Sequence, residues 1–138
     1  MGKRILSVVL GAVAAVVIVA LTELLAGTLY PLGGELDSAD AETTAAIMAG
    51  MPLPAKLLVV LAWFLGALGG AWLALRISDW RWAGWIVAVL VVAGGISAIV
   101  MLPHPLWMQV CAVVVPLLGG RIAARIHRKP YPGEPLLG

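Results

Sequence analysis

Between Arg81 and Arg121 the chain runs for 39 residues without a single Lys, Arg, Asp or Glu. As one α-helix, this stretch would be roughly 58 Å long at 1.5 Å per residue, about twice the thickness of a bilayer's hydrocarbon core. Pro103-His104-Pro105 interrupts it in the middle, and two prolines so close together cannot continue a helix. The stretch therefore predicts two membrane spans, about Trp82–Leu102 and about Leu106–Ala124, joined by a tight turn.

Two further spans precede this pair. Eighteen uncharged residues open a first span, about Ile5–Leu29, and 19 uncharged residues form a second, about Leu57–Leu75. The chain is 62% hydrophobic and 12% charged, whereas a soluble domain is about 45–50% apolar and about 25% charged. The sequence thus predicts an all-α integral membrane protein. It forms one domain, residues 1–138, with a bundle of four transmembrane helices in contact with the lipid bilayer.

The basic residues lie on one side of this topology. They precede the first span, separate the second from the third and follow the fourth: Lys3, Arg4, Arg76, Arg81, Arg121, Arg125, Arg128 and Lys129. The two opposite loops carry only Lys56. The positive-inside rule then predicts that both termini are cytoplasmic, with residues 125–138 as a cytoplasmic tail. The net charge of +2 is too small to indicate a nucleic-acid partner.

The basic residues after the fourth span share a helix face. Arg121, Arg125 and Arg128 recur at intervals of four and three residues, which is the spacing of neighbours on a helix surface. Long basic side chains at the end of a span can reach the acidic headgroups of lipids. We therefore expect these three residues to anchor the bundle at the membrane surface.

The first outer loop, residues 31–54, is the only sizeable soluble segment. It holds four acids, Glu35, Asp37, Asp40 and Glu42. Asp37 or Ser38 can cap a short amphipathic helix that lies on the membrane surface, and the prolines at 52 and 54 would end it. The loop is either a solvated connection or a surface that attracts cations or docks a partner.

Glu23 is the residue most out of place in this pattern. It follows 18 uncharged residues and lies seven residues, roughly 10 Å, before Tyr30 at the end of the first span. A charge at the centre of a span costs about 2.5–3.5 kcal/mol on insertion scales, and less near the interface. We expect Glu23 to point into the bundle, because it shares a helix stripe with Ala20 and Gly27. There it either forms an interhelical hydrogen bond or serves as a functional site.

His104 is the histidine predicted at the same end of the bundle as Glu23. A carboxylate and an imidazole could share a proton there, although the two positions differ in depth, and a histidine between two prolines is also a plain turn residue. No set of Cys, His and carboxylates has the spacing of a metal site, and no nucleophilic triad, phosphate loop or haem motif occurs. The sequence therefore indicates a protein that is not an enzyme and has no cofactor.

Small residues recur at helical spacing in all four spans. Because lipid provides no hydrophobic force between helices, association depends on close backbone approach at such residues. Gly66-x-x-x-Gly70 is the best match, and Gly95 and Gly120 occupy similar stripes. Pro116 interrupts the fourth span, producing either a kink or a free carbonyl that could bind a cation.

A faint internal repeat links the two halves of the chain. Leu68-Gly69-Gly70 ends the second span and Leu118-Gly119-Gly120 ends the fourth, 50 residues later. Parallel repeats of this kind occur in transporters, but the triplet is common in apolar chains. The two halves therefore either arose by duplication or share the triplet by chance.

Several motifs together resemble a family of small, uncharacterised four-helix bacterial inner-membrane proteins. They are Glu23, Leu29-Tyr30-Pro31, Met51-Pro52-Leu53, Leu61-Ala62-Trp63, the run Gly66–Gly70 and Leu102-Pro103-His104-Pro105-Leu106-Trp107. The resemblance covers nearly the whole chain and implies the four-span topology and a bacterial source. It implies no activity.

Two functions follow as hypotheses. The first is a noncatalytic accessory or scaffold protein, which associates with other membrane subunits or with itself through its small-residue faces. The second is an oligomeric proton or cation transporter or channel that uses Glu23, with the acidic outer loop as its mouth.

Overall fold

The computed structural model describes residues 1–32 and 40–127, and within them every element is a helix. The order is α1 (Gly2–Leu29), α2 (Ala41–Gly50), α3 (Leu53–Ser78), α4 (Arg81–Met101) and α5 (Leu106–Ile126). α1, α3, α4 and α5 are long and apolar enough to cross a membrane. The predicted all-α bundle of four spanning helices, with a short helix in the first loop, is confirmed.

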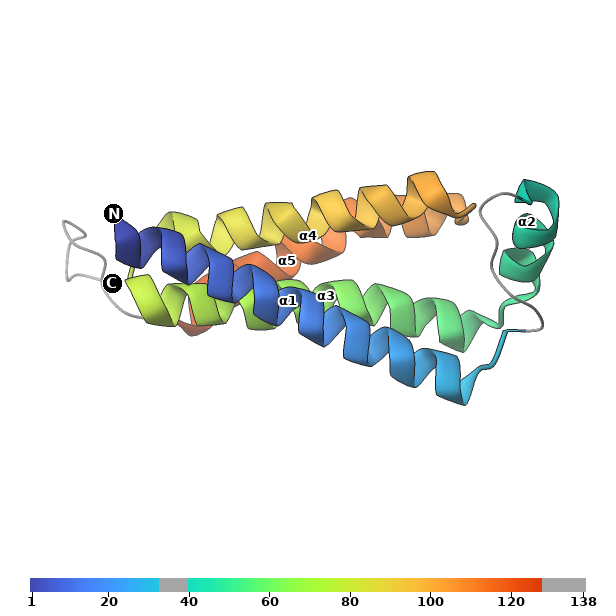
Figure 1. Cartoon of the computed structure of the whole chain (residues 1–138), viewed down its shortest axis with the longest axis horizontal. Helices are drawn as coiled ribbons and strands as arrows, with labels where there is room; N and C mark the ends of the chain where they lie inside the picture. Colours follow the sequence, from blue (N-terminus) through green and yellow to red (C-terminus); the bar gives the residue numbers. More distant parts are fainter. Residues whose placement is uncertain (33–39, 128–138) are drawn as a thin grey trace.

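The spanning helices run up and down, so the start of α1 and the end of α5 lie at one end of the bundle, and α2 lies at the other (Figure 1). We call the first end the basic end, because all the described Lys and Arg except one lie there: Lys3, Arg4, Arg76, Arg81, Arg121 and Arg125. The opposite end is the α2 end.

Prolines set the helix boundaries at the α2 end. Leu102, directly after α4, and Pro105, directly before α5, both have an extended backbone. This confirms the predicted tight turn between the two helices. The loop helix does end before Pro52 and Pro54, as predicted, but the predicted start of the second span at Leu57 is four residues late. α2 ends at Gly50, Pro52 is the N-cap of α3, and Pro54 lies in the first turn of α3. A proline is tolerated there because the first turn of a helix has no partner for its N–H groups.

The core consists of small residues at helix crossings. A Cβ added to Gly70 would lie 2.5 Å from the carbonyl oxygen of Gly11, and one added to Gly66 would lie 3.1 Å from that of Ala15. α1 and α3 therefore touch backbone to backbone, which is how helices associate when all their faces are apolar. α1 and α4 lie close together at the basic end and separate as they approach the α2 end (Figure 1).

The second pair of helices packs in the same manner. A Cβ on Gly120 of α5 would lie 2.7 Å from Ala88 of α4, and one on Gly95 would lie 3.2 Å from the Cβ of Ala112. Pro116 is buried within a helix that continues past it. The carbonyl oxygen of Ala112, which loses its helical donor to Pro116, lies 3.3 Å from that same position above Gly95. This carbonyl thus lies at the crossing of α4 and α5. The kink and the cation-binding carbonyl stay alternative interpretations of Pro116.

The faint repeat has a partial counterpart in the packing. Gly70 contacts α1 and Gly120 contacts α4, so each closes the helix pair of its own half of the chain. The preceding glycines differ, because Gly69 faces Ile18 of α1 while Gly119 faces the backbone of α3. Duplication of the two halves stays a hypothesis.

Candidate functional site

Glu23 does not lie on the packed face of α1. The buried residues of this helix are Ser7, Gly11, Ala15 and Ala26, whereas Ala20, Glu23 and Gly27 are exposed in the monomer. The expectation that this stripe points into the bundle stays a prediction, because the stripe lies outside the close α1–α3 contact but Glu23 lines cavities with Trp63 of α3 and Ala98 of α4. The backbone contact of α1 with α3 turns the stripe by about one residue, or about 100°, toward the open side facing α4.

The stripe instead lines a groove between α1 and α4. We call the α1–α4 groove the cavity of about 340 Å³ with these lining residues: Ala12, Ala15, Val16, Val19, Ala20, Glu23, Trp63, Val87, Leu90, Val91, Gly94, Gly95 and Ala98. Its wall is apolar except for Glu23, and it lies at the depth of the spanning segments. A carboxylate thus stands at the side of an apolar groove on the bundle surface.

A second cavity, of about 270 Å³, continues the groove to the α2 end. The two share Glu23, Trp63 and Ala98. The second also contains Tyr30 and His104, so the structure brings both candidate polar residues, Glu23 and His104, to one cavity. Among the described residues, Glu23 forms no hydrogen bond and no ion pair with a separation of 4 Å or less.

His104 is held by its own turn. Its Nδ1 atom lies 2.8 Å from the carbonyl oxygen of Leu102, and its ring centroid lies 6.2 Å from that of Trp63. Gln109 of α5 donates a hydrogen bond from Nε2 to the His104 carbonyl oxygen over 3.0 Å. The imidazole is therefore fixed beside the outer part of the groove and can act on a group bound there.

α2 covers the mouth of this outer cavity. Met48 is 3% exposed and lines the cavity with Val59 of α3, and Thr44, one turn earlier, is also buried. Met48 of the loop helix therefore reaches the outer cavity that the spanning helices line.

The acid that caps α2 is Asp40, so the predicted caps Asp37 and Ser38 were wrong. Asp40 Oδ2 accepts a hydrogen bond of 2.6 Å from the Thr43 hydroxyl, and Oδ1 accepts one of 3.1 Å from the Thr43 backbone N–H. These bonds hold the pKa of the Asp40 carboxyl below its ordinary value. Glu42 lies in the first turn, where it suits the helix dipole. Glu35 and Asp37 lie outside the described residues.

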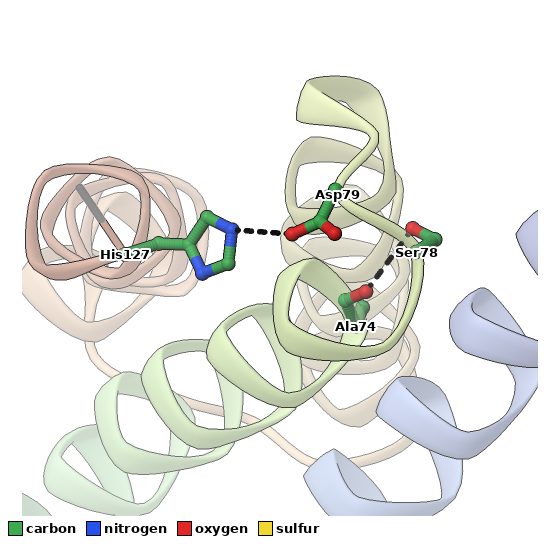
Figure 2. Close-up of polar contacts among 4 residues, drawn as sticks. All are labelled: Ala74, Ser78, Asp79 and His127. Atoms are coloured by element: carbon green, nitrogen blue, oxygen red, sulfur yellow. Dashed lines mark hydrogen bonds and ion pairs between the residues drawn. The ribbon is translucent and has the colours of Figure 1, made fainter. Parts of the chain in front are cut away.

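The basic end holds a polar contact that the sequence analysis missed. Nε2 of His127, at the end of α5, lies 3.5 Å from Oδ1 of Asp79, between α3 and α4 (Figure 2). Asp79 has a φ of 48°, a left-handed conformation that Asp adopts more readily than most residues. Asp79 is the C-cap of α3, whose last turn contains Arg76. The sequence signal for this cap was an Asp directly after a helix with a basic last turn.

The predicted headgroup residues are only partly described. Arg121 and Arg125 are exposed on α5 at the basic end, a position from which they can reach a membrane surface. Arg128 lies outside the described residues. Within the described part of the chain, no three His, Cys, Asp or Glu side chains form a group that could hold a metal ion.

Comparison with protein families, with curated proteins and with solved structures finds no match. The resemblance to small four-helix bacterial membrane proteins therefore stays a prediction, and the function is inferred from this chain's own residues.

Proposed function

We propose that the protein is a noncatalytic, multi-pass membrane subunit that acts by association, either in a larger assembly or as a homo-oligomer. In this proposal the α1–α4 groove receives a transmembrane helix. One observation carries the proposal: the groove combines an unbonded carboxylate, Glu23, with a mid-helix glycine, Gly94, that the described chain leaves uncovered.

Gly94 is a glycine in the middle of a spanning helix whose Cβ position is open, a property that it shares with Gly2 and Gly27 near the two ends of α1. A glycine in a helix interior destabilises the helix by about 0.5–1 kcal/mol relative to alanine, and close helix contact offsets this cost at Gly70 or Gly95. Apart from its chain neighbours and the nearby backbone of α4 itself, no described atom lies within 4 Å of the position that a Cβ on Gly94 would take. A helix from outside the chain could approach the backbone closely at this point.

Glu23 supports the same partner. A carboxylate at this depth is costly unless it is protonated, paired or hydrated. A hydrogen-bond donor on the incoming helix would satisfy it, and such bonds contribute about 0.6 kcal/mol on average and up to about 1.7 kcal/mol in membranes. The glycine thus admits the helix and the carboxylate fixes its register.

The distribution of charge favours an orientation with both termini in the cytoplasm, and the bacterial inner membrane that the resemblance implies is the proposed location. The basic end carries the starts or ends of all four spanning helices together with six described Lys and Arg residues. The α2 end carries Asp40 and Glu42 against Lys56. This asymmetry is the one that the positive-inside rule associates with a cytoplasmic basic end.

The first experiment is native mass spectrometry after gentle extraction from the source membrane, with two matched variants. Gly94→Leu places a large side chain in the groove. Ala93→Leu places the same side chain at the preceding residue, which is exposed and lies outside the groove. We expect Gly94→Leu to release the partner or the second copy and Ala93→Leu to retain it. A wild-type protein that is monomeric and without partner subunits would contradict the proposal.

A proton or cation transporter is the second candidate, because Glu23, His104 and Tyr30 line one cavity that lies toward the α2 end. Glu23→Gln and Glu23→Leu separate the candidates. Gln keeps a hydrogen-bonding group, so assembly should survive while flux in liposomes is lost if the carboxylate carries the ion. If assembly is lost with Leu and no flux is measurable even in the wild type, association alone is supported.

A further inference from the structure

Arg4 and Trp80 meet at the basic end, although 75 residues of sequence lie between them. The guanidinium carbon of Arg4 lies 5.4 Å from the ring centroid of Trp80, a cation–π contact between α1 and the segment that precedes α4. Two other pairs at this end are local, because Arg76 stacks on Trp72 of its own helix at 5.3 Å and Arg81 on the next residue at 5.7 Å. The Arg4 contact therefore requires the tertiary fold.

An apolar groove begins beside this pair. We call the basic-end groove the cavity of about 400 Å³ that is lined by Met1, Arg4, Ile5, Val8, Val9, Trp80 and Ile86. Its side chains come from the first turns of α1 and of α4, and all but Arg4 are apolar or aromatic. The groove is thus apolar along its length and cationic at one place.

The Arg4 guanidinium has capacity to bind an anion. Within residues 1–32 and 40–127 it forms no ion pair with an acid, and Ser7 bonds only the Arg4 carbonyl oxygen. The contact with Trp80 holds the guanidinium at the basic end. A guanidinium has five N–H donors, so it can bind a phosphate in a bidentate manner.

We infer that the basic-end groove binds one anionic phospholipid, with its phosphate on Arg4 and an acyl chain along Ile5, Val9 and Ile86. Charge complementarity selects the headgroup, since Lys3 and Arg81 flank the same end and add to the positive field. The apolar lining selects a chain-bearing anion over a free phosphate. The site is separate from the α1–α4 groove and does not depend on its function.

The test is native mass spectrometry of the full-length protein in detergent, titrated with phosphatidylglycerol or with phosphatidylcholine of the same acyl chains. We expect one phosphatidylglycerol to be retained at concentrations where phosphatidylcholine is not. Arg4→Gln should weaken retention by about fivefold or more, the effect of one basic residue near an anionic lipid. Arg76→Gln is the matched control, because Arg76 stacks on a tryptophan at the same end but lies outside the groove.

A second variant tests the acyl-chain part of the site. Val9 is 51% exposed, so Val9→Trp should fold, which circular dichroism can verify, and should fill the groove while Arg4 stays in place. We expect it to lose phosphatidylglycerol as well. Equal loss in Arg4→Gln and Arg76→Gln, equal retention of both lipids, or displacement of the lipid by inorganic phosphate alone would each overturn the inference.

Discussion

His127 of α5 and Asp79, between α3 and α4, approach to 3.5 Å at the basic end, between Nε2 and Oδ1 (Figure 2). The His127 side chain is fully buried and the Asp79 side chain is 44% exposed. The pair therefore links the last spanning helix to the turn in the middle of the chain.

Asp79→Ala should destabilise the bundle more than Asp79→Asn does. Both changes remove the Asp79 carboxylate, whose Oδ1 lies 3.5 Å from Nε2 of His127. Asp79→Ala should lose roughly a further 1–2 kcal/mol of stability, because alanine tolerates the left-handed φ of 48° less well than Asp or Asn. Thermal unfolding in detergent, followed by circular dichroism, measures the difference. Equal midpoints for the two variants would contradict a backbone role for Asp79.

Gly70→Ala should destabilise the protein, whereas Gly94→Ala should not. The new Cβ on Gly70 would lie 2.5 Å from a backbone oxygen of α1, which cannot move aside independently, and overpacking of this kind costs about 1–3 kcal/mol. At Gly94 the space is open and alanine is the better helix former. Titration of the monomer with sodium dodecyl sulfate compares the two. A loss of stability in both variants would show that Gly94 packs within the chain.

The start of α2 should loosen at acidic pH. The Asp40 pKa is lowered in the folded state because Thr43 donates two hydrogen bonds to the carboxylate. The stabilisation is therefore complete above the unfolded pKa and is lost as the pH falls through the lower, folded pKa. Hydrogen exchange of the α2 amides at neutral pH and at about pH 3 measures this change. Asp40→Asn, which caps without titrating, should remove the pH dependence.

Met48→Ala should detach α2 from the bundle without unfolding the spans. Met48 is 3% exposed and lines the outer cavity, and truncation of a buried methionine costs about 2–5 kcal/mol in well-packed cores. We expect faster hydrogen exchange in residues 41–50 and unchanged exchange in α3. Ile47→Ala, at the neighbouring, less buried position, is the control and should have a smaller effect.

The sequence predicted the four spans and the short loop helix within a few residues, because these features depend on local properties. The length of an uncharged apolar run is set by bilayer thickness, and prolines such as Pro105 mark helix starts through their missing N–H. The α3 boundary was shifted from Leu57 to Leu53 because Pro54 fits the first turn of a helix as readily as it ends one.

The sequence could not identify the faces that pack. In a soluble helix a polar face identifies the outside, but α1 is apolar on nearly every side, so its periodicity gives no orientation. The sequence alone established a membrane-embedded helical bundle with one carboxylate at membrane depth. Only the tertiary structure decided that Glu23 faces a groove beside α4, that His104 shares its cavity and that Arg4 stacks on Trp80. The reason is that the backbone contact between Gly11 and Gly70, which is a long-range steric fit, fixes the rotation and tilt of α1.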